Sequence, residues 1–306
     1  MSVVVVGSIA FDAVKTPFGE RERMLGGSAV HFSLAASYFS DVRVVGPVGD
    51  DFGEEEYEVL RAHGVNTDDV EHVEGGRTFF WAGEYEWNVN VRHTLETQLN
   101  VFGDFQPKLS DGAKAAEVLF LANIQPDLQR EVREQCSAKL AGLDSMNYWI
   151  ESARESLVKT IGTVDLILMN DDEVRQLTEE PTVLLAARKI MELGPRVVVV
   201  KQGEYGASLF TEDGFFSLPS YPLEKVIDPT GAGDSFAGGF FGYLDSQGGA
   251  TDDATLRRAM TYGSAVASYW VEEFGCETAE RLTRDDIEER YEAFRAMTTV
   301  EGVTTG

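Results

Sequence analysis

The chain has 306 residues and a formal net charge of −26, from 26 Lys and Arg against 52 Asp and Glu. A surface of that charge repels nucleic acid and anionic membranes, so we expect neither as a partner. No run approaches the roughly 18 apolar residues that span a membrane, and the first residues lack the basic start of a signal peptide. We therefore expect a cytoplasmic protein. Two cysteines, Cys136 and Cys276, are too few for a disulfide framework.

Apolar runs of strand length alternate with helical segments along most of the chain. We expect strands at residues 3–6, 42–45, 118–121, 143–144, 164–169 and 197–201, and an antiparallel pair at 207–210 and 215–218. We expect helices at residues 28–36, 57–62, 127–138, 152–161, 171–177, 183–193, 235–244, 253–271 and 285–297. This alternation predicts an α/β fold, a doubly wound and mostly parallel sheet flanked by helices, in one domain over residues 1–306.

The pattern changes between residues 77 and 105, where two short segments rich in aromatic residues, 78–85 and 89–95, flank a turn. Such an antiparallel piece inserted into a βα pattern indicates a small β lid or an oligomer interface. We expect the lid to comprise about residues 12–25 and 77–105. Its aromatic side chains would form either the lid core or a surface that stacks on a ligand, and we favour the core.

Asp12 lies just beyond the first strand, where α/β sheets carry ligand-binding groups at the carboxyl ends of their strands. Gly26 and Gly27 follow, directly before a predicted helix, and a glycine pair lets a ligand approach the backbone closely. A simple turn before a helix explains the glycines equally well.

Asn170 and Glu173 lie where another strand becomes a helix, in the string Asn-Asp-Asp-Glu. They are one helical turn apart and can face the same site. A helix N-cap with an acidic residue at its third position predicts the same spacing, so the pair has two interpretations.

The most specific stretch is Asp228-Pro-Thr-Gly-Ala-Gly-Asp234. A strand, a glycine turn and an apolar helix leave free backbone N–H groups at the helix N-terminus, where they attract phosphate. Asp234 lies in the first helical turn and is the group there that can accept a proton. Neither a Walker A loop nor GxGxxG fits the string. Gly-Ala-Gly by itself would be read as a tight turn, but the full string combines two carboxylates, a hydroxyl and two glycines.

In a doubly wound sheet these three stretches fall at strand carboxyl ends and can line one crevice. Together they predict phosphoryl transfer, a reaction that depends mostly on positioning and charge stabilisation. Asp234 needs no raised pKa for this role, because an aspartate with the ordinary pKa of about 4 can accept the alcohol proton late in the reaction.

The chain resembles the ribokinase-like (PfkB) family of ATP-dependent sugar and nucleoside kinases over nearly its whole length. DPTGAGDSF is similar to the family's C-terminal signature, NDDE at 170–173 to its NxxE motif, and Gly26-Gly27 after Asp12 to its substrate motif. The resemblance implies a kinase that moves the γ-phosphate of ATP to an alcohol of a sugar or polyol.

The resemblance also implies roles for individual residues. Asp234 would be the catalytic base, and Gly231, Ala232 and Gly233 the anion hole. The acceptor would be bound by Asp12, Gly26, Gly27, His31 and Asn147. Asn170 and Glu173 would organise Mg²⁺ and the ATP phosphates, Glu173 holding Mg²⁺ through water. The rest of the nucleotide site would include Lys201, Gly203, Thr230, Ser264 and Gly275, and Asp228 with Thr230 would form a loop for a monovalent cation such as K⁺. The lid would be a surface for homodimers.

One residue departs from the family pattern. Ribose-specific members carry asparagine where this chain has His31, which puts ribose itself in doubt, although histidine can still donate to a sugar hydroxyl. His31 could equally be a helix residue without a ligand role. A nucleoside kinase is the alternative, because Phe79, Trp81, Tyr85 and Trp87 could stack on a base. A non-catalytic nucleotide-binding regulator is the alternative from another class.

The excess of acidic residues is spread along the chain, which suggests a protein adapted to a salty cytoplasm. Because salt screens repulsion between surface charges, we expect the melting temperature to rise from low to molar KCl. Thermal melts across a KCl series measure this, and a flat curve would contradict the hypothesis.

Overall fold

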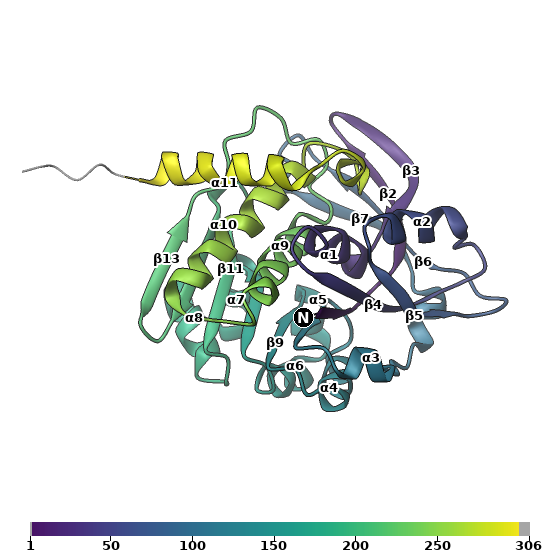
Figure 1. Ribbon diagram of the computed structural model, residues 1–306, viewed down its shortest axis with the longest axis horizontal. Helices are drawn as coiled ribbons and strands as arrows, with labels where there is room; N and C mark the ends of the chain where they lie inside the picture. The colour runs from purple at the N-terminus through teal and green to yellow at the C-terminus, as the bar shows by residue number, and fades with distance from the viewer. Residues whose placement is uncertain (1, 300–306) are drawn as a thin grey trace, which may run out of the picture.

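The computed structural model describes residues 2–299, which form a nine-stranded sheet covered by helices and a separate four-stranded sheet (Figure 1). The strands of the large sheet, in spatial order, are β13 (Gly214–Leu218), β12 (Ala207–Thr211), β11 (Val197–Lys201), β10 (Leu166–Asn170), β9 (Leu140–Asp144), β8 (Val118–Leu121), β1 (Ser2–Val6), β4 (Asp41–Val48) and β5 (Asn66–His72). The strands from β11 to β5 are parallel, and β12 and β13 continue the sheet antiparallel. The predicted α/β fold is confirmed.

The nine predicted helices are present with shifts of a few residues at their ends, and two short helices, at residues 111–114 and 147–152, were not predicted. The helices are α1 (Ser28–Ala36), α2 (Glu54–Ala62), α3 (Asp111–Lys114), α4 (Pro126–Gln135), α5 (Asn147–Ser152), α6 (Arg154–Ile161), α7 (Asp171–Thr178), α8 (Val183–Met191), α9 (Ala232–Ser246), α10 (Asp253–Trp270) and α11 (Arg284–Thr298), with 3₁₀ turns η1 (Asn100–Asp104), η2 (Gly203–Tyr205) and η3 (Glu277–Glu280). The sequence analysis missed β5, because its sequence NTDDVEH is polar and the strand lies at the edge of the sheet, where it needs little apolar surface.

The apolar run of β1 serves both faces of the large sheet. Val3 and Val5 pack in one buried cluster with α1, α9 and α10, whereas Val4 and Val6 pack in a second cluster with α4, α6, α7 and α8. Successive strand residues point to opposite faces, so a continuous apolar run is what a sheet covered on both sides requires.

Three phenylalanines join α1, β8 and α9 on the first face. The rings of Phe32 and Phe120 stack with centroids 4.5 Å apart, and Phe241 lies 5.0 Å from Phe120. A Cβ at Gly142 would come within 2.1 Å of the Phe241 ring, so glycine on β9 leaves the space that this ring fills. The contact fixes α9 against the middle of the sheet.

The small sheet has the order β3 (Gly19–Gly26), β2 (Ala10–Thr16), β6 (Phe79–Tyr85) and β7 (Arg92–Gln98). It lies at the same end of the molecule as β4 and β5, away from β13 (Figure 1). The strand expected at 89–95 begins instead at Arg92, and residues 86–91 form a longer turn. Among the helices of the described residues, none is long and apolar enough to cross a membrane.

Replacing Phe120 by alanine should lower the free energy of unfolding by about 3–5 kcal/mol, because the ring is fully buried between two others. Phe215→Ala is the matched control, since that side chain is 67% exposed and its loss should cost about 0.5 kcal/mol or less. Urea unfolding of both variants measures the difference, and equal losses would contradict this account of the core.

Candidate active site

The N-terminus of α9 presents unpaired backbone N–H groups. Gly231 is the N-cap in the left-handed region, with φ 75°, which turns the chain sharply into the helix. The Ala232 N–H donates to the Pro229 carbonyl at 3.2 Å. Those of Gly231, Gly233 and Asp234 find no acceptor in the part of the chain described. The sequence analysis assigned the amides of Gly231, Ala232 and Gly233 to an anion hole. The Ala232 amide is already bonded, so the free amides are those of Gly231, Gly233 and Asp234.

Asp234 is partly buried in the first turn of α9. Burial raises the pKa of this carboxyl to about 6, and the Asp144 carboxylate adds to the rise, while the Lys201 ammonium opposes it. The sequence analysis assumed an ordinary value, because the other carboxylates near Asp234 come from distant parts of the chain. A base of this pKa is still deprotonated at neutral pH and is a stronger proton acceptor than an ordinary aspartate.

Lys201, at the end of β11, forms an ion pair with Asp144, at the end of β9, with Nζ 2.7 Å from Oδ2. Burial opposes the charge on Lys201, but the Asp144 and Glu173 carboxylates outweigh it and raise the pKa of the ammonium. A Cβ at Gly233 would lie 3.0 Å from Nζ, so the ammonium is adjacent to the anion hole. Sequence reasoning did not select Asp144, although an acidic residue ending a parallel strand was the available signal.

Asn170 and Glu173 form a reciprocal capping box on α7. The Asn170 N–H donates to Glu173 Oε2 and the Glu173 N–H to Asn170 Oδ1, both at 2.8 Å. The capping interpretation is thus confirmed, and the pair also faces the site. Burial, and after it the Asp144 carboxylate, raise the pKa of Glu173 to about 7, while Lys201 lowers it.

The carboxylates of Asp144, Glu173 and Asp234 all raise the pKa of the Lys201 ammonium. The Asp144 carboxylate also raises the pKa of Glu173 and of Asp234. Among residues 2–299, no group of three His, Cys, Asp or Glu side chains is arranged to hold a metal ion. This donor set fits Mg²⁺, which typically binds proteins through one or two carboxylates and takes its other ligands from waters and phosphates.

The acceptor candidates on the small sheet gather around Asp12. Asp12 is buried on β2, and a Cβ at Gly26 would lie 2.0 Å from its Oδ2. Gly27 has φ 94°, and a Cβ there would come within 2.4 Å of the Ser8 carbonyl oxygen. Close contacts therefore require glycine at both positions. The sequence alone did not show why glycine is needed there.

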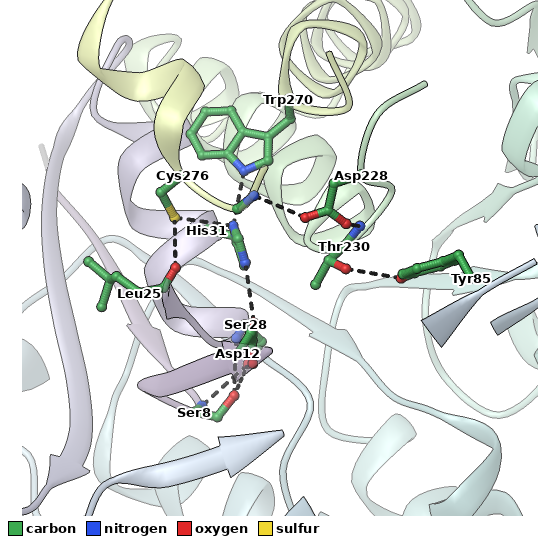
Figure 2. A network of polar contacts seen from close by, with 11 residues as sticks. Ser8, Asp12, Leu25, Ser28, His31, Tyr85, Asp228, Thr230, Trp270 and Cys276 are labelled. Atoms are coloured by element: carbon green, nitrogen blue, oxygen red, sulfur yellow. Dashed lines mark hydrogen bonds and ion pairs between the residues drawn. The ribbon is translucent and has the colours of Figure 1, made fainter. Parts of the chain in front are cut away.

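His31 lies between Asp12 and Gly231, the N-cap of α9. Figure 2 shows its ring pointing toward Asp12 with one nitrogen and toward Trp270 with the other. Its Nε2 faces Asp12, 3.9 Å from Oδ2, and a Cβ at Gly231 would meet the imidazole ring at 2.5 Å. The Trp270 indole lies 2.9 Å from Nδ1, and the Cys276 sulfur lies 3.4 Å from the same atom. Nε2 is buried and has no hydrogen-bond partner among the described residues.

The contact with Trp270 determines the tautomer of His31. Burial lowers the pKa of the ring, but Cys276 and Asp12 outweigh it and raise that pKa well above its ordinary value. The Trp270 contact opposes the charged form, because a proton on Nδ1 would face the indole N–H at 2.9 Å. An indole N–H can only donate, so Nδ1 has to accept. The ring is therefore neutral and carries its proton on Nε2, as a donor directed toward Asp12.

Asp228 and Thr230 lie on the loop before α9. The two carboxylate oxygens of Asp228 accept from the backbone N–H groups of Thr230 at 2.8 Å and Gly275 at 3.0 Å. The hydroxyl of Thr230 lies 3.1 Å from the hydroxyl of Tyr85 on β6, so the small sheet touches the anion-hole loop (Figure 2).

A cavity of about 570 Å³, which we call the β11–α10 cavity, opens beside the anion hole. Its lining includes Lys201, Gly203, Gly233 and Ser264. Gly275, expected in the same pocket, is instead packed against Met24 and bonded to Asp228.

Asn147 is the predicted residue with the least connection to the site. It begins α5, is exposed, and its Oδ1 accepts from the neighbouring Tyr148 N–H at 3.1 Å. Its assignment to the acceptor site stays a prediction.

Comparisons with known proteins relate the chain to a family over most of its length. The sequence profile of the pfkB family carbohydrate kinases matches residues 2–282. A cytidine kinase of Thermococcus kodakarensis is 27% identical, with 78% of this chain and 87% of that protein covered. A nucleoside kinase of Methanothermobacter thermautotrophicus is 27% identical, with 90% and 91% covered. The structure of a Burkholderia thailandensis nucleoside kinase in complex with inosine has a TM-score of 0.80 at 20% identity, with 95% and 97% of the two chains covered.

A base with the pKa of Asp234 should give the reaction an acid limb. We expect kcat/KM to fall about tenfold per pH unit below about pH 6, because the carboxyl is then protonated and cannot accept a proton. Asp234→Asn should lower kcat by about 10²- to 10⁴-fold. Asp285→Asn is the matched control, an exposed aspartate in the first turn of α11. An acid limb near pH 4, or turnover surviving in Asp234→Asn, would contradict this assignment.

Proposed function

The chain belongs to the pfkB family of carbohydrate kinases, and from that membership we propose that it transfers the γ-phosphate of ATP to a hydroxyl group of a nucleoside. The relatives described as cytidine and nucleoside kinases support the nucleoside over a simple sugar.

The observation that carries the choice of acceptor is the pairing of Asp12 with Trp81. The two residues are register partners on the parallel strands β2 and β6, so their side chains lie on the same face of the small sheet. Tyr85, on the same face of β6, contacts Thr230 beside the anion hole. A carboxylate for ribose hydroxyls on the same face as an indole for a base suits a nucleoside.

The proposed reaction starts with the acceptor hydroxyl between Asp234 and the anion hole. Asp234 accepts the hydroxyl proton as the hydroxyl oxygen forms its bond to the γ-phosphorus. The bond from that phosphorus to the β,γ-bridging oxygen breaks, and ADP leaves. Free N–H groups at Gly231, Gly233 and Asp234 stabilise the charge on the moving phosphoryl group, and Lys201 adds a fixed positive charge beside them.

Mg²⁺, held through Glu173 and its neighbouring carboxylates, would neutralise phosphate charge when bound. The β11–α10 cavity would take the adenosine part of ATP, because its lining combines Gly233 and Lys201 with the apolar side chains of Leu223, Ala267 and Val271. The net charge of −26 makes this local neutralisation necessary for an anionic substrate.

His31 and Asp12 would hold one hydroxyl of the acceptor between them. The buried Nε2–H has no protein acceptor among the described residues, and Asp12 offers a carboxylate 3.9 Å away. A hydroxyl can accept from the first and donate to the second. This arrangement supports a ligand role for His31 in place of the asparagine of ribose-specific members.

Two further features of the family are proposals for this chain. The loop of Asp228 and Thr230 would bind K⁺. Turnover measured in KCl and in NaCl at equal ionic strength tests this. The small sheet would act as a lid and as a dimer surface, because Leu95 is exposed on its edge strand β7 and Trp87 and Leu99 are exposed next to its strands. Sedimentation across protein concentrations tests the dimer.

ADP release over a panel of nucleosides, simple sugars and polyols, with Asp234→Asn as the inactive control, tests the proposed activity. We expect turnover with a nucleoside. Turnover with a sugar alone would identify a sugar kinase, and silence across the panel would favour a nucleotide-binding regulator.

Trp81→Ala should raise KM for the nucleoside at least fivefold, because a base stacked on an aromatic ring is worth about 1–3 kcal/mol. KM for ATP should stay unchanged and serves as the internal control. Trp81→Phe should restore most of the affinity. An unchanged nucleoside KM in Trp81→Ala would contradict the stacking role.

A further inference from the structure

The turn between β6 and β7, residues 86–91, leaves the small sheet and reaches the β11–α10 cavity. Val89 and Asn90 line that cavity together with Gly203 and Glu204 from the η2 turn. The two segments are more than a hundred residues apart in sequence, and they meet only because the small sheet lies over the carboxyl ends of the large sheet's strands. Part of the wall of the proposed nucleotide site therefore comes from the small sheet.

Asn90 is held in a defined orientation. Its Nδ2 donates to Asn88 Oδ1 at 3.0 Å and to Glu204 Oε1 at 3.3 Å, and its backbone N–H donates to Asn88 Oδ1 at 3.1 Å. Carboxylate Oε1 can only accept, so the nitrogen of the Asn90 amide faces Glu204 and the two amide protons are both used.

The carbonyl oxygen of Asn90 remains available. Oδ1 accepts no hydrogen bond from residues 2–299, and it lies 3.0 Å from where a Cβ at Gly203 would be. Gly203 has φ 53°, so a side chain there would be strained as well as crowded by Asn90. A free acceptor at the wall of a cavity is available to a donor from the ligand.

The position in the cavity selects that donor. Phosphate groups only accept, and the neighbouring Glu204 carboxylate would repel them, so Oδ1 does not bind phosphate. The base belongs against the apolar wall of Leu223, Ala267 and Val271, and the phosphates belong at Gly233. The ribose joins the two, and its hydroxyls are donors.

We propose that Asn90 is a nucleotide-binding residue contributed by the small sheet, whose side-chain Oδ1 accepts a hydrogen bond from a ribose hydroxyl of ATP or ADP. This inference rests on the proposed use of the β11–α10 cavity for nucleotide. It adds a contact from a part of the chain that otherwise serves the acceptor.

The same hairpin contacts both halves of the site. Tyr85, five residues before Asn90, reaches Thr230 next to the anion hole, and Asp12 lies on the adjoining strand β2. A nucleotide that holds Asn90 thereby stabilises the position of the sheet that carries the acceptor residues. Coupling of this kind is reciprocal, so the acceptor in turn strengthens nucleotide binding.

Calorimetric titration with ADP and Mg²⁺ tests the contact without any acceptor or turnover, so its result is independent of which alcohol is phosphorylated. Asn90→Ala should weaken ADP binding about threefold to tenfold, the usual effect of one hydrogen bond. Thr97→Ala, an exposed position on β7, is the matched control and should bind like the wild type. Unchanged affinity in Asn90→Ala would overturn the proposal.

A thermodynamic cycle separates a ribose contact from a merely structural role. Of 2′-deoxy-ADP and 3′-deoxy-ADP, one should bind the wild type more weakly than ADP but bind Asn90→Ala as well as ADP does. If both analogues lose the same affinity in the two proteins, Asn90 only shapes the turn and the proposal fails. Hydrogen exchange should also show residues 86–91 protected by ADP in the wild type, and no protection there would count against it.

Discussion

The close packing of α9 against α1 is the constraint on which the site depends. A Cβ at Gly231 would meet the His31 ring at 2.5 Å, one at Gly238 would meet the Phe32 carbonyl at 2.4 Å, and one at Gly242 would meet the Ala36 carbonyl at 2.8 Å. Glycine at these positions lets the two helices approach until backbone meets backbone. The N-terminus of α9, with its anion hole, is thereby brought beside the helix that carries His31.

Electrostatics sets a second condition. Asp144, Glu173 and Asp234 share the ammonium of Lys201, and burial together with repulsion from Asp144 raises the pKa of both Glu173 and Asp234. In a chain with a net charge of −26, such a cluster would repel ATP unless cations compensated. In the proposed reaction the same cluster would supply the oxygen ligands and the proton acceptor, so the repulsion would be inherent in the chemistry.

The small sheet completes the arrangement. It brings Asp12 to the acceptor end through β2, Tyr85 to the anion-hole loop through β6, and Asn90 to the β11–α10 cavity through the turn that follows. The imidazole of His31 accepts a hydrogen bond from Trp270 on α10 through Nδ1. Its other nitrogen, Nε2, faces Asp12 on β2. The small sheet therefore reaches the proposed acceptor site, the loop before α9 and the proposed nucleotide site.

The sequence by itself determined the α/β fold, the strand-turn-helix string ending at Asp234, and the pairing of Asn170 with Glu173. Each of these depends on neighbouring residues, so periodicity, glycine and capping chemistry are enough to predict them. Only the tertiary structure decided which distant groups meet. Lys201 and Asp144 pair because β9, β10 and β11 are adjacent in the sheet, and His31 meets Trp270 because α1 and α10 both pack on α9. The raised pKa of Asp234 follows from those encounters, and no local pattern records them.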